Sequence, residues 1–518
     1  MLARVHTASL LGLTARPITV EVDLARGLPT FHLVGLPDGV VRESRERVTA
    51  ALSNSGFALP LRRITVNLAP ADEPKRGSGF DLPIALAILQ ADGTLAPGGR
   101  GSPLAAVGEL ALDGRVRPVR GVLPATAALA ALGASQVLVA AENAREAALV
   151  RSVDAIPVGS LRAAVEHVSG LHPIPPQAPV HEAPCRQHDH DWAEIRGQAA
   201  GRRALEIAAA GLHNALLIGP PGAGKTFLAR RLPTILPVLT EDEALEVTAI
   251  HSAWGKLSPD QPLVTSPPFR APHHTTSAAA LLGGGHPARA GEVCLAHRGV
   301  LFLDELPEFR RDALEGLRQP LEDGEVLIGR ARERQRFPTC FLMLAAMNPC
   351  PCGWWGDERR ACRCTPGSRR VYRGRLSGPL LDRIDLHVPF RSLAFADLID
   401  GGPAEPSASV RARVAAARER QRCRGRSNGR LEPGRGARWA RLCREGRRLL
   451  EAAHARLGLS ARAHVRVLRV ARTIADLEGR EDIGPMDIAE AVQYRALDRP
   501  FEEEGKEKGR DADRVSAR

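Results

Sequence analysis

The eight residues 219–226, GPPGAGKT, have the composition of a loop that binds nucleotide phosphates. They follow the apolar run ALLI and open the helical run FLARRL, which is the strand–loop–helix context such a loop needs. Glycines let backbone N–H groups face the phosphates, the lysine reaches the β and γ phosphates, and the threonine ligates Mg²⁺. The residues of the predicted ATP site are Gly219, Pro220, Pro221, Gly222, Ala223, Gly224, Lys225 and Thr226.

Polar side chains also follow two later apolar runs. VLFL is followed by Asp304 and Glu305, and FLMLAAM is followed by Asn348. An aspartate in this place holds Mg²⁺, directly or through water, and the glutamate activates the attacking water. The asparagine amide could orient that water against the γ-phosphate. The three strand-like runs together predict ATP hydrolysis by a P-loop ATPase.

Three arginines later in the chain could act on the same phosphates. Arg383, within LSGPLLDRIDLHV, is either a salt-bridge partner at a helix end or a finger that stabilises transition-state charge in a neighbouring subunit. Arg462 and Arg466 lie one turn apart on a helix that Ser460 is suited to cap, and either could touch the γ-phosphate. A finger supplied by a neighbour requires an oligomer, most simply a closed ring.

Four cysteines between residues 348 and 364 form two CxC pairs. Four thiolates can give tetrahedral coordination of Zn²⁺, although CxC is tighter than the usual CxxC spacing. Reduced structural thiols and a redox switch are the alternatives. Trp354 and Trp355, between the pairs, could stack on a nucleic-acid base or pack the loop. The candidate zinc ligands are Cys350, Cys352, Cys362 and Cys364.

Arginines alternate with other residues in EVLIGRARERQRFP, just before the run that ends at Asn348. In a β-hairpin such residues share one face, where they could bind DNA phosphates without reading sequence. The alternative is an exposed edge strand protected by charge. The candidate DNA contacts are Arg330, Arg332, Arg334 and Arg336.

The charge of the chain is unevenly distributed. The formal net charge is +12 over 518 residues, and residues 411–450 hold 14 Arg against three acidic residues. Such a cluster indicates either a polyanionic partner or a solvated helix surface. No run approaches the roughly 20 apolar residues of a membrane span, so we expect a cytoplasmic protein without membrane contact.

The pattern of elements predicts a multidomain α/β chain. Short apolar strands alternate with helical runs over residues 1–170, a Pro/His-rich linker covers 171–191, and a second α/β pattern with a parallel sheet covers 192–395. We expect an Arg/Gly/Pro-rich connection over 396–440, a helical lid over 441–500 and a disordered tail over 501–518.

Several long motifs in order give the chain a family resemblance. GPPGAGKT, FRAPHHTTSAAALLGGG, AHRGVLFLDELPEF, AAMNPCPCGWWGD, LSGPLLDRIDLHV and VARTIADL resemble the YifB/ComM family of magnesium-chelatase-like AAA+ ATPases, as do VGLPDGVVRESRERV and RRITVNLAPAD near the start. The resemblance implies a hexameric AAA+ ring on a Lon-like, ribosomal S5 domain 2-like N-terminal domain. Its ComM members are implicated in branch migration during natural transformation. It also implies that Arg383 is the finger and Arg462 the second sensor, with Arg466 in reserve.

A Lon-like domain raises the question of proteolysis. KRGSGFDLPIALAIL resembles the Lon segment that carries the catalytic serine, here Ser78. The segment that carries the Lon lysine aligns with Ala125 at the lysine position, and Lys75 lies in the wrong segment. A serine without a base is not an activated nucleophile, so we expect a domain without protease activity.

These inferences predict an ATP- and Mg²⁺-dependent hexameric motor acting on single-stranded or branched DNA, with Zn²⁺ as a third candidate cofactor. The resemblance implies a helicase that promotes branch migration during natural transformation or homologous recombination. The alternative is a partner-remodelling ATPase, or a magnesium-chelatase-like metal-insertion ATPase, that does not act on DNA.

Overall fold

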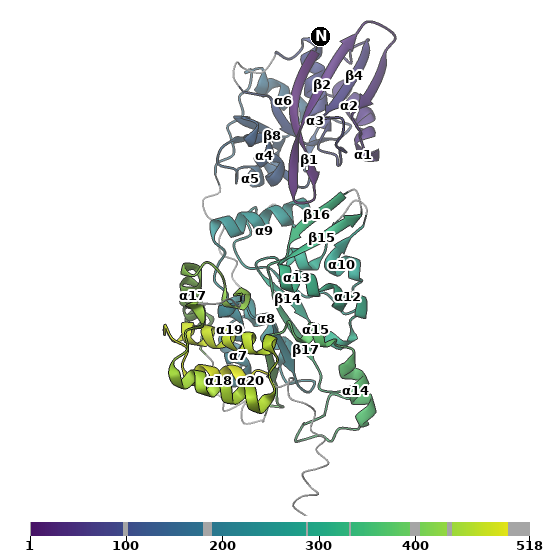
Figure 1. The fold of residues 1–518 in the computed structure, drawn as a ribbon. Helices are drawn as coiled ribbons and strands as arrows, with labels where there is room; N and C mark the ends of the chain where they lie inside the picture. The colour runs from purple at the N-terminus through teal and green to yellow at the C-terminus, as the bar shows by residue number, and fades with distance from the viewer. Residues whose placement is uncertain are drawn as a thin grey trace, which may run out of the picture.

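The computed structural model describes residues 2–96, 102–179, 189–258, 260–285, 289–330, 333–393, 405–432 and 438–495. An N-terminal α/β unit lies at one end of an elongated molecule, a second α/β unit lies below it, and the C-terminal helices pack beside the second unit (Figure 1). The expected tail over 501–518, part of the linker (180–188) and the stretches 394–404 and 433–437 lie outside the described residues.

The N-terminal unit is built on a seven-stranded mixed sheet with the order β3-β4-β2-β1-β5-β8-β9. The long strands β1 and β2 alternate buried and exposed residues, as strands with one covered face do. They pair antiparallel from Leu2↔Asp23 to Leu11↔Thr14, so a two-residue turn joins them. The strand bounds are β1 Leu2–Leu11, β2 Thr14–Ala25, β3 Thr30–Val34, β4 Arg63–Ala69, β5 Ala105–Val107, β8 Gln136–Ala140 and β9 Asp154–Val158, and the short hairpin is β6 Glu109–Leu110 with β7 Val116–Arg117.

Helix α3 forms the centre of this unit because DLPIALAILQAD is apolar on nearly all sides, and such a helix must be buried. It contacts β1, β2 and β5. The helices of the unit are α1 Gly39–Arg42, α2 Ser44–Asn54, α3 Asp81–Asp92, α4 Val122–Ala131, α5 Ala144–Ala147 and α6 Leu161–Val168.

Both residues weighed for a catalytic lysine position, Ala125 and Lys75, lie in the described part of this unit. Ala125 lies in α4, is buried and has no side chain that could act as a base. Lys75 is also buried, and its ammonium donates a hydrogen bond to the carbonyl oxygen of Pro70.

The second unit contains a parallel five-stranded sheet with the order β11-β14-β17-β10-β18. Its central strands, ALLI, VLFL and LMLAAM, are continuous apolar runs that are buried on both faces, as parallel sheets require. The strand bounds are β10 Ala215–Ile218, β11 Phe269–Arg270, β14 Val300–Leu303, β17 Leu342–Met347 and β18 Leu386–Pro389.

Helices and two small hairpins surround this sheet (Figure 1). The helices are α7 Ala199–Gly211, α8 Lys225–Ile235, α9 Glu241–Ala253, α10 Ala278–Leu282, α11 Glu292–Leu295, α12 Arg311–Gly316, α13 Arg318–Asp323, α14 Pro366–Gly374 and α15 Gly378–Leu381. The hairpins are β12 Gly283–Gly284 with β13 Arg289–Ala290, and β15 Glu325–Arg330 with β16 Glu333–Pro338. Among the described residues, no helix is both long enough and apolar enough to cross a bilayer.

The C-terminal unit consists of α17 Ser407–Cys423, α18 Arg444–Leu457, α19 Ala461–Leu477 and α20 Pro485–Gln493. The prediction of an irregular connection over 396–440 is therefore wrong for Ser407–Cys423. Val410, Val414 and Ala417 are buried at helical spacing against α7 and α8, and this apolar stripe stabilises α17 although its other positions are rich in arginine.

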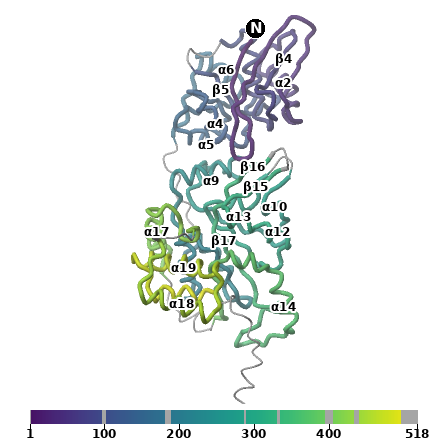
Figure 2. Tube along the Cα trace, viewed as in Figure 1, coloured from purple at the N-terminus to yellow at the C-terminus, as the bar shows by residue number. Residues whose placement is uncertain are grey.

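The described parts of the two α/β units contact each other at several places, two of which are the packing of α4 on α9 and the approach of the β1–β2 turn to a hairpin. Helix α4 packs on α9, where Ser252 donates a hydrogen bond to the carboxylate of Glu146 and Gly121 N donates to Ser252 O at 3.1 Å. The turn between β1 and β2 reaches the β15–β16 hairpin (Figure 2). A Cβ at Gly12 would lie 2.6 Å from Gln335 Oε1, so the turn and the hairpin are in close contact.

A buried polar network joins α19 to the amino end of β18. Asp385 Oδ2 lies 3.1 Å from His213 Nδ1, and Asp385 Oδ1 accepts from Arg466 Nη1 at 2.5 Å. His213 Nε2 lies 2.7 Å from the hydroxyl of Thr473 on α19. Although burial opposes it, the charges of Arg466 and His213 hold the pKa of Asp385 well below its usual range. The network therefore depends on an ionised carboxylate.

Asp385→Ala should lower the free energy of unfolding by about 3–5 kcal/mol, because it leaves the partner charge buried without its carboxylate. Urea denaturation followed by circular dichroism measures this loss. Asp382→Ala is the matched control, since the Asp382 side chain is 41% exposed and lies 3.6 Å from Arg462. A surface pair of this kind contributes less than about 1 kcal/mol. Equal losses for the two variants would contradict this account of the network.

Candidate active site

The loop 219–226 connects β10 to α8, as the sequence predicts. Gly222 and Gly224 have φ of +78° and +87°, a left-handed conformation that favours glycine, and α8 begins at Lys225. The ammonium of Lys225 donates hydrogen bonds to Gly219 O at 2.6 Å, Pro220 O at 2.9 Å and Asn348 Oδ1 at 3.1 Å. A cation, a helix N-terminus and a glycine-rich loop therefore meet at one point, as phosphate binding requires.

The side chain of Lys225 is buried. Burial lowers the pKa of Lys225 to about 8, and the nearby charge of Asp304 opposes this shift. A phosphate beside the ammonium would favour its charged form. Because the group is desolvated, its interaction with that anion is stronger than the same interaction in water.

Asp304 lies directly beside the loop at the end of β14. Its Oδ2 accepts a hydrogen bond from Thr226 Oγ1 at 2.7 Å, and its Oδ1 accepts from the backbone N–H of Glu305 at 3.0 Å. A hydroxyl and a carboxylate side by side are hard oxygen donors of the kind that Mg²⁺ prefers. Thr226 and Asp304 would hold the ion, which would neutralise phosphate charge there.

Glu305 has a left-handed backbone with φ of +51°. Its Oε2 lies 3.3 Å from Nδ1 of His274, which follows β11. The contact between these two residues was not expected from the sequence. The imidazole gives the carboxylate a fixed partner at the position from which it would activate water.

The predicted arginines lie at the opposite edge of the sheet. Arg383 precedes β18, and its carbonyl oxygen accepts from Asn214 Nδ2 at 3.0 Å, just before β10. Since the loop with Lys225 follows the other end of β10, the four residues of β10 separate the two edges. At about 3.3 Å per residue this is about 13 Å. Arg383 is therefore not brought to the Lys225 of its own chain.

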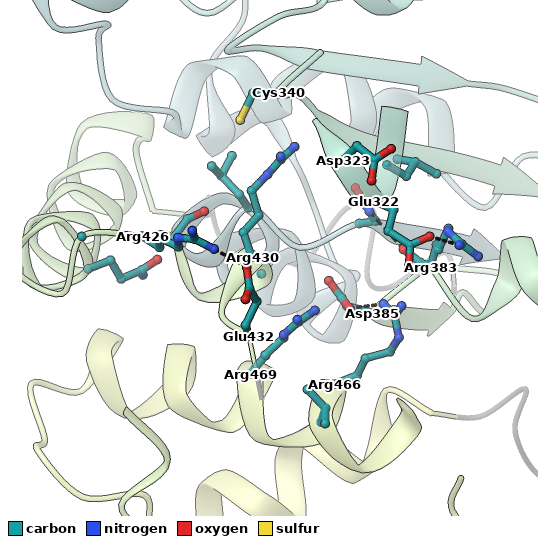
Figure 3. Close-up of a pocket in the computed structure, with 18 of the residues that line it drawn as sticks. Glu322, Asp323, Cys340, Arg383, Asp385, Arg426, Arg430, Glu432, Arg466 and Arg469 are labelled. Carbon is teal, nitrogen blue, oxygen red and sulfur yellow. Dashed lines mark hydrogen bonds and ion pairs between the residues drawn. The ribbon is translucent and has the colours of Figure 1, made fainter. Parts of the chain in front are cut away.

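Arg383 and both candidate second-sensor arginines line one cavity of about 1180 Å³ between the sheet edge and the C-terminal helices. Figure 3 shows the guanidinium of Arg383 directed to Glu322, with which it forms an ion pair, and that of Arg466 directed to Asp385. Arg462 lies 3.6 Å from Asp382. Nine arginines and six acidic residues line the cavity, so it carries an excess of positive charge.

The arginine-rich segment before β17 forms the expected hairpin. β15 pairs antiparallel with β16, and Val326, Ile328 and Phe337 are buried on its inner side. Arg334 and Arg336 are exposed on the other face, opposite Gly329 and Leu327. Arg330 ends β15, and Arg332 lies outside the described residues. Two of the four predicted DNA contacts are thus shown on one exposed face.

The four cysteines of the CxC pairs come together, with all four sulfur atoms within 4.8 Å of one another. The tryptophans between them have arginine partners. Arg360 lies 4.7 Å from the ring of Trp354, and Arg373 lies 4.6 Å from that of Trp355. These contacts favour the interpretation that the rings pack the loop.

Two partners in the site were missed by sequence reasoning. Glu322 is 61 residues from Arg383, and nothing in the sequence around it signals the pairing. His274 lies within FRAPHHTTSAAALLGGG, a segment that contributed above only to the family resemblance. Its position after a short strand of the same parallel sheet was the available signal, because such ends meet at one edge.

The sheet, the loop, the acidic pair and the helical C-terminal unit define a P-loop ATPase of the AAA+ class. Models of the magnesium chelatase subunit ChlI match residues 20–143 and 191–398, and a model of its C-terminal part matches 404–495. YifB of Escherichia coli K12, described as uncharacterized, is 43% identical over 96% of this chain and 98% of its own length.

The competence protein ComM of Haemophilus influenzae is 43% identical over 96% of this chain and 98% of its own length. The chain therefore belongs to the YifB/ComM family of magnesium-chelatase-like AAA+ proteins. Lon protease 2 of Bacillus subtilis is 29% identical over 27% of this chain, which fits the expectation of a Lon-like part. Membership of this family indicates an ATPase.

Lys225→Ala should abolish ATP binding and hydrolysis, because the buried cation that meets the phosphates is removed. Glu305→Gln should retain ATP binding and lose turnover by about 10²–10⁴-fold, the contribution of a general base. Binding of a fluorescent ATP analogue and release of phosphate measure the two effects separately. Retained turnover in Lys225→Ala would contradict the assignment of the loop.

Proposed function

We propose that this protein is an ATP-dependent DNA motor that works as a hexameric ring, a helicase promoting branch migration in the cytoplasm during homologous recombination or natural transformation. The observation that carries the proposal is the exposed pair Arg334 and Arg336 on a hairpin joined to an ATP site. Guanidinium groups on one face bind phosphates without reading sequence, as a motor that moves along DNA requires. The Haemophilus influenzae relative is named a competence protein, and that name supports the proposed role in natural transformation.

The hairpin is connected to the ATP site through short elements. β16 ends at Pro338, β17 begins at Leu342, and β17 leads directly to Asn348. On the other side, α13 holds Glu322, the partner of Arg383, and β15 follows at Glu325. A shift of the hairpin would therefore displace Asn348 and the ion-pair partner of Arg383.

The separation of the arginines from Lys225 supports a ring. Arg383 and Arg462 lie at the amino edge of the sheet, and the P-loop lies at the carboxyl edge. A head-to-tail assembly would place the amino edge of one subunit against the carboxyl edge of the next, and such contacts form a ring when the rotation between subunits closes. In that arrangement both arginines would act on ATP bound by the neighbour.

The cofactors of the proposed motor are ATP, Mg²⁺ and Zn²⁺. Gly222, Gly224 and Lys225 would hold the phosphates, and Thr226 with Asp304 would hold Mg²⁺. The cysteine cluster would hold Zn²⁺. A partner-remodelling or chelatase-like ATPase that does not act on DNA would use the same ATP site, so the support for a DNA substrate comes from the hairpin.

The rate of ATP hydrolysis, measured without DNA, with single-stranded DNA and with a four-way junction, tests the proposal. We expect stimulation by DNA that is lost in Arg334→Ala/Arg336→Ala. For single-stranded DNA, the slope of the logarithm of the binding constant against the logarithm of the salt concentration should become shallower by about 0.7 for each lost phosphate contact. Arg62→Ala/Arg63→Ala removes the same charge from exposed positions at the start of β4, outside the arginine cluster over 411–450, and should behave as the unmodified protein. A robust basal rate that no DNA changes would overturn the proposal and favour the partner-remodelling alternative.

Arg383→Ala should bind ATP but hydrolyse it about 10³-fold more slowly or worse, the usual effect of losing an arginine finger. Mixing it with Lys225→Ala subunits should restore part of the activity, since some interfaces then combine an intact loop with an intact finger. Phosphate release over a range of mixing ratios measures the recovery. No recovery in rings shown by native mass spectrometry to be mixed would contradict a finger that acts between subunits.

A further inference from the structure

The geometry of the cysteine cluster fits tetrahedral coordination of one ion. Cys350 Sγ lies 3.4 Å from Cys352 Sγ and 3.6 Å from Cys362 Sγ, and Cys352 Sγ lies 3.6 Å from Cys362 Sγ. Four sulfurs at about 2.3 Å from a zinc ion are about 3.8 Å apart. The separations are much longer than the roughly 2.0 Å of a disulfide bond.

Backbone N–H groups donate to two of the sulfurs. The backbone N–H of Cys352 donates to Cys364 Sγ at 3.4 Å, and that of Cys364 donates to Cys362 Sγ at 3.4 Å. Such donors orient and stabilise negative sulfur around a metal. Only Cys350 is buried, and the other three are partly exposed. Four thiols gathered at a half-exposed position are not explained by apolar packing.

The loop that carries the cysteines packs on the ATP site. Gly353, next to Cys352, is buried and has φ of +85°. A Cβ at Gly353 would lie 2.7 Å from Cδ of Pro221, in the phosphate-binding loop, and 3.9 Å from Cγ of Asn348. The backbone of Gly353 thus fills the space between the phosphate-binding loop and the end of β17.

A second contact anchors the far side of the same loop. Ser392 donates a hydrogen bond to the carboxylate of Asp357, which lies between the two CxC pairs. Ser392 follows Phe390, whose side chain and carbonyl lie against Gly219, where a Cβ would be 2.6 Å away. The cysteine loop therefore contacts both ends of the P-loop region, directly at Pro221 and through the chain after β18 at Gly219.

We infer that a zinc ion held by Cys350, Cys352, Cys362 and Cys364 is a brace for the ATP site, so that loss of the ion loosens Gly353 from Pro221 and Asn348. Ligation would fix the positions of Cys350, which lies two residues after Asn348, and of Cys352, which directly precedes Gly353. The inference rests on the proposed function only in taking 219–226 as the ATP site, and it does not depend on DNA.

The test measures zinc content and binding of a fluorescent ATP analogue in the full chain, kept reduced and without DNA. We expect about one zinc per chain in the unmodified protein. Cys362→Ser/Cys364→Ser should hold none and bind the analogue about tenfold more weakly. Cys423→Ser, at an exposed position on α17, is the matched control and should keep both properties.

Gly353→Ala separates the brace from the folding of the loop, because it leaves all four cysteines in place. It should retain zinc and still weaken binding of the analogue about tenfold, since a side chain must displace Pro221. The inference is overturned if the reduced protein holds no zinc. It is also overturned if the zinc-free variant or Gly353→Ala binds ATP as the unmodified chain does. Absence of DNA stimulation in the unmodified protein, measured in the separate hydrolysis assay, would count against the motor and not against this inference.

Discussion

The direction of the five parallel strands is the constraint on which the rest of the site depends. Because all of them run the same way, the ends of β10, β14 and β17 bring Lys225, Asp304 and Asn348 to one edge. The same rule places Arg383, at the start of β18, on the other edge. A single chain therefore holds Arg383 apart from the phosphate-binding loop, and the proposed ring would bring the two together across neighbouring subunits.

Buried polar or close packing contacts lie at both the amino and the carboxyl edge of the parallel sheet. At the amino edge, the buried carboxylate of Asp385 joins β18 to α19 through Arg466, so the C-terminal helices are held beside Arg383. At the carboxyl edge, Gly353 fills the space beside Pro221 and Asn348. The N-terminal unit touches the hairpin at Gly12 and α9 at Ser252, so it contacts the hairpin that carries Arg334 and Arg336.

Sequence reasoning located the elements of the site better than the contacts between them. The phosphate-binding loop, Asp304, Glu305 and Asn348 could be found because each directly follows an apolar strand, and the arginine hairpin could be found from its alternation. The pairs Arg383–Glu322 and His274–Glu305 could not, since they join segments whose approach only the tertiary fold sets. Helix α17 was missed because its arginines masked the spacing of Val410, Val414 and Ala417.

The most direct test of the central claim is a cryo-electron microscopy map of the Glu305→Gln protein with bound ATP, because slow hydrolysis should trap the assembled state. The account predicts a closed ring in which the guanidinium of Arg383 has left Glu322 and contacts the γ-phosphate held by Lys225 of the neighbouring subunit. A map in which ATP is bound while Arg383 stays paired with Glu322, and no neighbour reaches the phosphates, would contradict it.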